Sequence, residues 1–281
     1  MGPKILIATN GYSGSQPSID YGTWLAELLD GTVTLLGVDE HPRPALRTDH
    51  SAVEDFCADA VKVLEAHKVE NRLEIQTGDA EAVIPRKSHE ADYITVVGPL
   101  GRSHLHRLFM GRSIRHLMAE ICGPIVYVPQ SRLPPKKLLI CIGGLGYEMT
   151  AENLALQIGS AAHAEVVVLH VVPPLELDYP TARIMRSEWD HLVETNTPVG
   201  RSLRKALETA QGMGLNTRVV GRQGNIVEEI LDEVRTGGYD LLCMGSPYST
   251  NALRQLYASN VTADIAQSVE IPLITARYKK D

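Results

Sequence analysis

The chain has 281 residues, which is enough for two domains, and its 44% hydrophobic and 22% charged residues are typical of an ordinary folded protein. This composition excludes disordered, collagen-like and coiled-coil proteins. The net charge of −7 leaves neither half with a basic surface, so nucleic-acid binding is disfavoured, and no signal peptide or membrane span is predicted.

The first half of the chain alternates apolar strands with amphipathic helices. One helix is predicted to begin at the capping box Ser51–Glu54, and a short helix is predicted to run from Asp79 through Ile84. The strands are continuous apolar runs, as expected for a parallel sheet that is buried on both faces. They are predicted at residues 4–11, 33–38, 92–98 and 123–128.

The second half repeats the order of the first. Residues 137–144 match residues 4–11 at an offset of 133, so the opening strand pattern occurs twice. Later strand patterns also recur, at a larger offset, which indicates an insertion in the second copy near residues 173–198. The recurring strands are predicted at residues 166–171, 239–245 and 271–276.

This alternation predicts an α/β fold with two tandem domains, residues 1–132 and 133–281, separated by the stiff linker Gln130–Pro135. In each domain we expect an open, doubly wound parallel sheet with helices on both faces. Ligands of such sheets bind beyond the carboxyl ends of the strands. The loops at residues 8–14 and 98–113 are therefore the candidate site.

The loop at residues 98–113 combines glycines with positive charge. The stretch from Tyr93 to Ala119 contains no Asp or Glu. Glycine lets backbone N–H groups approach an anion, and a helix N-terminus favours phosphate, so the pattern predicts a small anionic ligand. The alternative is an ordinary solvated loop. The arginines of this stretch are Arg102, Arg107, Arg112 and Arg115.

The spacing Gly98-x-x-Gly101, nine residues, Gly111 and a following hydroxyl residue resembles the nucleotide signature of universal stress proteins. The resemblance covers essentially the whole chain as two tandem copies. It implies two flavodoxin-like, adenine-nucleotide-hydrolase-like domains with five-stranded sheets that often bind ATP and dimerise through the last strand. It also implies ATP, ADP or AMP as the ligand, with Mg²⁺ arriving on its phosphates. The positions carried over as nucleotide contacts are Ala8, Thr9, Asn10, Val38, Val97, Gly98, Gly101, Arg102, Gly111, Arg112 and Ser113.

Two of these positions depart from the family pattern. Asn10 stands where the family usually has Asp, which keeps a carbonyl acceptor, adds a donor and removes the charge. Arg112 follows Gly111 where a Ser or Thr is usual, and Ser113 comes one residue later. A guanidinium at this place can supply a charge-assisted phosphate contact. Both departures leave nucleotide binding as the expectation.

The second copy lacks the glycine spacing. Tyr248 replaces the second glycine, Ala258-Ser259 takes the place of the third, and Gly143 takes the place of Asn10. A tyrosine in the loop hinders close backbone approach to phosphate, so we interpret this copy as degenerate, with a structural or dimerising role. The alternative is a smaller anion bound by hydroxyl groups. Those groups belong to Ser246, Ser249, Thr250 and Ser259.

Histidines and cysteines suggest no further site. His104 and His106, with His116 further on, could bind a metal, but two histidines with no nearby Cys or carboxylate are a weak signal, and His170 is expected to be a hydrogen-bonded strand-end residue. The four cysteines form no CxxC pair and lie in apolar surroundings, so we expect reduced thiols in a cytoplasmic protein. They are Cys57, Cys122, Cys141 and Cys243.

The sequence thus favours a cytoplasmic sensor or regulator that binds an adenine nucleotide in its first domain. Its domains are expected to pair within the chain, with a second copy, or both, without nucleic-acid or membrane partners. The alternative is a scaffold that binds no nucleotide and acts through dimerisation and protein partners. A further alternative is a weak ATP hydrolase, although no acid–base pair or known hydrolase motif can be nominated, so hydrolysis is expected to be slow and incidental.

Overall fold

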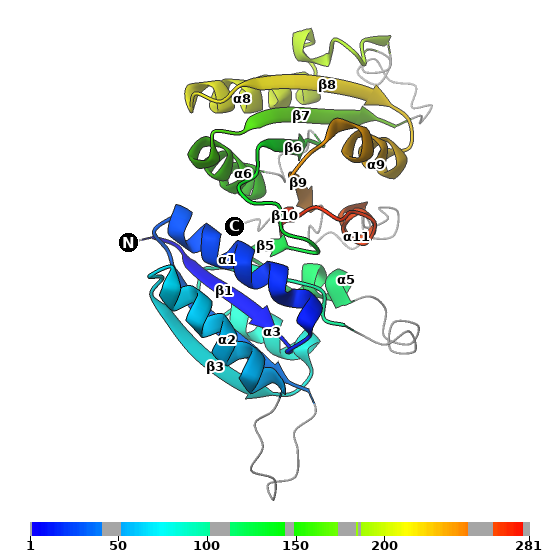
Figure 1. Ribbon diagram of the computed structural model, residues 1–281. Coiled ribbons are helices and arrows are strands. Elements are labelled where there is room, and N and C mark those ends of the chain that lie inside the picture. Colours follow the sequence, from blue (N-terminus) through cyan, green and yellow to red (C-terminus); the bar gives the residue numbers. More distant parts are fainter. Residues whose placement is uncertain are drawn as a thin grey trace, which may run out of the picture. The chain divides into compact units, whose positions relative to one another are not determined.

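The computed structural model describes residues 2–40, 52–101, 113–143, 149–173, 184, 187–246 and 261–277 (Figure 1). The chain divides into two compact units, Met1–Leu133 and Pro134–Asp281. This division falls one residue after the expected boundary, inside the proline-containing linker.

The described residues of the first unit form five parallel strands in the order β3-β2-β1-β4-β5. The two central strands bury nearly all of their side chains, because helices cover both faces of the sheet. This order confirms the predicted open, doubly wound parallel sheet. The strands are β1 (Lys4–Thr9), β2 (Thr32–Asp39), β3 (Asn71–Thr77), β4 (Tyr93–Val97) and β5 (Pro124–Tyr127).

Two pairs of helices cover the two faces of this sheet (Figure 1). Helices α1 (Gln16–Leu28) and α2 (Ala52–Ala66) pack together on one face. Helices α3 (Ala80–Ser88) and α5 (Ser113–Glu120) pack together on the other. This arrangement follows from right-handed crossovers that run outward from β1 in both directions.

The described residues of the second unit repeat the topology, with parallel strands in the order β8-β7-β6-β9-β10. The strands are β6 (Lys137–Cys141), β7 (Glu165–Val172), β8 (Thr217–Gln223), β9 (Leu241–Ser246) and β10 (Leu273–Arg277). The helices are α6 (Met149–Ala162), α8 (Pro198–Gly212), α9 (Ile226–Gly237) and α11 (Val261–Ala266), and a short 3-10 helix, η2, spans Leu192–Glu194.

Polar caps begin the helices that follow the edge strands. Asp79 Oδ1 accepts a hydrogen bond from Glu81 N at the start of α3, and Asn225 Oδ1 accepts from Val227 N at the start of α9. The predicted end of α3 at Ile84 was wrong, because the helix continues through Pro85 to Ser88. An interior proline removes a helical donor and crowds the carbonyl four residues before it, yet the helix continues, and Pro85, Lys87 and Ser88 are buried.

The described part of the insertion packs against its own unit. The Trp189 carbonyl lies against Gly221 of β8 so closely that a side chain at position 221 would overlap it. Leu192 is buried, and Thr197 caps α8 by accepting a hydrogen bond from Gly200 N. This part of the insertion therefore extends the core, as apolar residues in an insertion usually do.

Within the described residues, no helix combines the length and the apolar character that crossing a membrane requires.

Candidate functional site

Three neighbouring strands of the first unit bring the predicted positions to one edge of the sheet. Ala8 of β1 pairs in register with Val97 of β4, and on the other side β1 pairs with β2, which contains Val38. The chain leaves β1 toward β2 and returns to β4 on the opposite side, so this edge is the topological switch point of the sheet.

Several predicted positions lie outside the described residues. These are Arg102, Gly111 and Arg112, together with His104 and His106. Ser113 is the first residue of α5, and His116 lies in the same helix. Ala8, Thr9, Val38 and Val97 are fully buried, backbone included, so in this structure they present no surface at this edge.

Asn10 joins the loops that follow three strands. Its Nδ2 atom donates to Glu40 Oε2 at 2.7 Å and to the Leu100 carbonyl at 2.9 Å. The other carboxylate oxygen of Glu40 accepts from Ala80 N, the first residue of α3, at 3.0 Å. One amide and one carboxylate thus fix the relative positions of the loops after β1, β2 and β4 and the start of α3.

These contacts explain why position 10 is an asparagine rather than the family's aspartate. Both partners of its Nδ2 atom are acceptors, a carboxylate and a carbonyl, so the side chain has to donate. Glu40 was not predicted from the sequence. The signal that could have identified it is an acidic residue directly after the second strand, at the edge where ligands of this topology bind.

The Thr9 hydroxyl stabilises the turn after β1. Its Oγ1 atom lies 2.8 Å from Ser15 Oγ and accepts from Gly11 N at 3.1 Å. Ser15 Oγ also lies 2.6 Å from the Tyr12 carbonyl, to which it can donate. Because Thr9 and Ser15 are both fully buried, these hydroxyls hold the loop that carries Asn10.

Gly98 and Gly101 each have a packing reason to be glycine. A Cβ atom at Gly98 would lie 3.0 Å from Ser15 Cα, so the chain after β4 passes close to the start of α1. Gly101 has a φ of +61°, and a Cβ atom there would lie 2.5 Å from Cγ of the Tyr12 ring. Local packing therefore accounts for both glycines, and Tyr12 is a second site residue that sequence analysis missed.

The corresponding edge of the second unit differs in its polar groups. Gly143 provides no side chain where Asn10 stands in the first unit. His170 takes the place of Gly37, and its Nδ1 atom lies 2.6 Å from the Ile142 carbonyl. Among the described residues its Nε2 atom has no partner, and burial lowers the pKa of this imidazole. The hydrogen bond expected for this histidine is therefore present, at Nδ1. Residues 247–260, with Tyr248, Ser249, Thr250 and Ser259, lie outside the described part.

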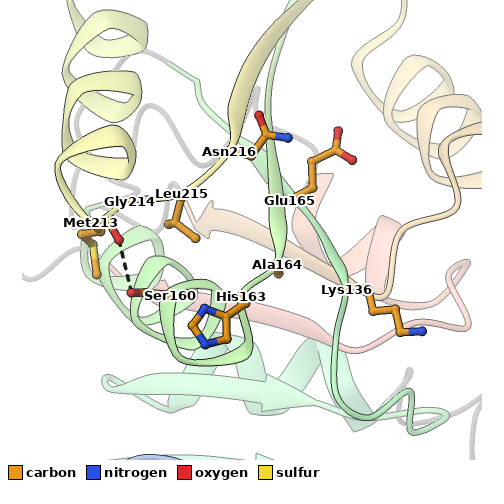
Figure 2. A pocket seen from close by; sticks show the side chains of 9 residues that line it. All are labelled: Lys136, Ser160, His163, Ala164, Glu165, Met213, Gly214, Leu215 and Asn216. Atoms are coloured by element: carbon orange, nitrogen blue, oxygen red, sulfur yellow. Dashed lines mark hydrogen bonds between the residues drawn. The ribbon is translucent and has the colours of Figure 1, made fainter.

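A hollow of about 640 Å³ lies at the opposite, amino edge of the second unit's sheet (Figure 2). Lys136 precedes β6, Glu165 begins β7 and Asn216 precedes β8, while His163 follows the end of α6. The Ser160 hydroxyl lies 3.4 Å from the Met213 carbonyl across this hollow (Figure 2). The hollow includes none of the predicted site residues.

Among the described residues, no group of three or more His, Cys, Asp or Glu side chains is arranged to hold a metal ion. Within the same part of the chain, Cys57, Cys122, Cys141 and Cys243 are free thiols. Burial raises the pKa of Cys57 to about 11, so its thiol is protonated at neutral pH.

The chain belongs to the universal stress protein family, whose family model matches residues 135–277. This match covers the second unit, including the segment in which the glycine spacing is lost. A comparison with curated proteins finds no match.

Solved structures with the same fold extend over both units. The match to a universal stress protein from Archaeoglobus fulgidus covers 99% of this chain and 97% of that protein, with a TM-score of 0.68 and 14% sequence identity. The match to the cytoplasmic domain of a prokaryotic cation chloride cotransporter covers 99% of this chain and 96% of that domain, with a TM-score of 0.54 and 12% sequence identity. At such identities the likeness shows the fold alone.

A universal stress protein solved in complex with cAMP matches 52% of this chain with 99% of its own, at a TM-score of 0.40 and 20% identity.

Proposed function

We propose that the first unit binds ATP, or the related ADP or AMP, at the carboxyl edge of its sheet, and that the protein acts as a nucleotide-dependent sensor or regulator. The observation that carries the proposal is the switch point between β1 and β4. There the loops after both strands are joined by the hydrogen bond from Asn10 to the Leu100 carbonyl. Ligands of open α/β sheets bind at this kind of crevice.

The residues present suit an adenine nucleotide. The resemblance to universal stress proteins places Ala8, Val38 and Val97 beside the base and ribose, and Gly98 and Gly101 begin the loop that would approach the phosphates. Beyond Gly101 the sequence supplies Arg102 and Arg112, whose guanidinium groups would pair with phosphate oxygens. Mg²⁺, when bound, would neutralise phosphate charge and be held largely by phosphates and water.

The second unit is proposed to have a structural or dimerising role without a nucleotide. In the second unit, His170 places a side chain where the first unit has Gly37. Gly143 has no side-chain amide to join the loops as Asn10 does. The free thiols of the described cysteines suit a reducing compartment, so we place the protein in the cytoplasm.

Calorimetric titration of the full chain with ATP tests the proposal. We expect saturable binding of one ATP per chain, and we expect Gly101→Tyr, which copies Tyr248 of the second unit, to reduce the association constant by at least about tenfold. Tyrosine at this position would fill the loop and would be strained at a φ of +61°.

Gly238→Tyr is the matched control. Gly238 ends α9 in the second unit with a φ of +66°, and an added Cβ atom there meets no other described atom within 4 Å. This variant also places a tyrosine at a positive φ, with similar backbone strain, and should bind ATP like the wild type. Absence of saturable binding by the wild type would favour the scaffold instead. Equal affinity of both variants, each shown to be folded by its unfolding transition, would place the nucleotide elsewhere.

A further inference from the structure

The side chain of Tyr12 lies across the start of the candidate phosphate loop. Added Cβ atoms at Gly14 and at Gly101 would both overlap its ring, so the ring is held between the loop after β1 and the loop after β4. A ligand oxygen that approaches Gly101 from the side of its missing Cβ would meet this ring first.

The backbone of Tyr12 is fixed, whereas its ring is held only by packing. The Tyr12 carbonyl accepts a hydrogen bond from Ser15 N at 2.8 Å and lies 2.6 Å from Ser15 Oγ, while Tyr12 N donates to Asn10 Oδ1 at 3.4 Å. Within the described residues its phenol oxygen has no hydrogen-bond partner, and 44% of the residue is exposed. A change of rotamer can therefore move the ring without rearranging the loop.

The two copies of the domain place a tyrosine on opposite loops. At the repeat offset of 133, Tyr12 corresponds to Leu145, and at the larger offset of 147 that applies after the insertion, Gly101 corresponds to Tyr248. Each copy therefore has one tyrosine and one smaller residue at this pair of positions. In the first copy the tyrosine lies on the loop after β1, and the loop after β4 keeps its glycine.

We propose that Tyr12 is a displaceable cover that competes with the phosphates of a bound nucleotide for the surface of Gly101. This proposal rests on the nucleotide binding proposed above and concerns its regulation. The observed affinity for ATP then equals the intrinsic affinity multiplied by the fraction of molecules in which the ring has swung away. Any partner or modification that holds the ring outward would raise the affinity.

Three substitutions of Tyr12 in the full chain test the cover, with ATP as the titrant. If the ring covers Gly101 in nine molecules out of ten, Tyr12→Ser raises the association constant about tenfold. Tyr12→Phe keeps the ring and loses only a hydroxyl without a described partner, so it should bind like the wild type. Tyr12→Leu, which copies Leu145, should fall between these two. An unfolding transition for each variant confirms that it is folded.

The possible outcomes separate the cover from the binding site. Measurable binding by the wild type, with tighter binding by Tyr12→Ser, supports both. Wild-type binding that Tyr12→Ser leaves unchanged or weakens overturns the cover and keeps the nucleotide site. Weaker ATP binding by Tyr12→Ser, together with wild-type binding by Tyr12→Phe, would identify the ring as a stacking surface for the nucleotide. Absence of binding by all four proteins overturns both proposals.

Discussion

At Asn10, the candidate site depends on a side-chain nitrogen that donates hydrogen bonds, where a carboxylate oxygen could not. The substitution Asn10→Asp would place a carboxylate where the amide now donates to Glu40 and to the Leu100 carbonyl. Loss of these hydrogen bonds and repulsion between carboxylates should lower the free energy of unfolding by about 1–3 kcal/mol at pH 7. Urea unfolding measures this change.

The rescue of this variant is equally specific. Glu40→Gln in the Asn10→Asp background restores one donor and one acceptor, because the new amide at position 40 can donate to the new carboxylate while its carbonyl still accepts from Ala80 N. Part of the lost stability should return in the double variant, because the hydrogen bond to position 40 is restored while the Leu100 carbonyl still faces a carboxylate. A double variant no more stable than Asn10→Asp would show that the pair does not act as described.

Residues of the candidate site were predictable from sequence only where a pattern carries them. The glycine spacing nominated Gly98 and Gly101, and the resemblance to universal stress proteins nominated Ala8 and Val38; these site positions stay predictions. Tyr12 and Glu40 belong to no repeating pattern, since each acts through a contact with a loop far away in sequence, and only the folded chain brings these loops together. The packing role of Gly101 was missed for the same reason.

Most strands, β5 and β10 included, were predictable from their apolar runs, whereas β3 and β8 were not. β3 alternates exposed and half-buried residues, with Leu73 39% and Ile75 41% exposed, and β8 is also incompletely buried, so neither strand forms the continuous apolar run that identifies a buried strand. Their polar residues serve other elements instead. On β3, Glu74 pairs with the buried ammonium of Lys87 on α3 at 2.7 Å.

The edge strand β8 is joined to α9 by Arg222. Its guanidinium contacts Glu233 at 2.7 Å and Glu229 at 3.2 Å. Burial alone would raise the pKa of Glu233, but hydrogen bonds from Tyr239 and Arg222 hold it below its ordinary value. Arg222→Met removes this partner of a nearly buried carboxylate, so stability at pH 7 should fall by about 1–3 kcal/mol.

The pH dependence of this loss has a definite sign. A depressed carboxylate pKa gives stability that is present above the unfolded value of about 4.5 and is lost as the pH falls toward the folded value. The difference between the wild type and Arg222→Met should therefore shrink below pH 4.5 in urea unfolding. Arg218→Met is the control, because Arg218 on the same strand forms a half-exposed pair with Glu165 at 3.4 Å and should matter by less than about 1 kcal/mol.

At the scale of the whole molecule, one copy matches the family model and the other carries the glycine spacing. The family model matches residues 135–277, the copy that lost the glycine spacing, while the copy with the glycine spacing has the substituted Asn10 and the covering Tyr12. Overall family likeness reflects the many buried positions that maintain the sheet. A binding site depends on a few loop residues, so fold and function can diverge separately within one chain.

Amide hydrogen exchange of the full chain, with and without saturating ATP, tests most directly whether the first unit alone binds the nucleotide. We expect slower exchange at residues 10–12, 38–40 and 98–101 of the first unit, where bound nucleotide would contact or order the loops. We expect no change at residues 143, 171–172 and 244–246, the corresponding edge of the second unit. Protection at the second unit's edge, or saturable binding without protection of the first unit's edge, would rule out a single site in the first unit.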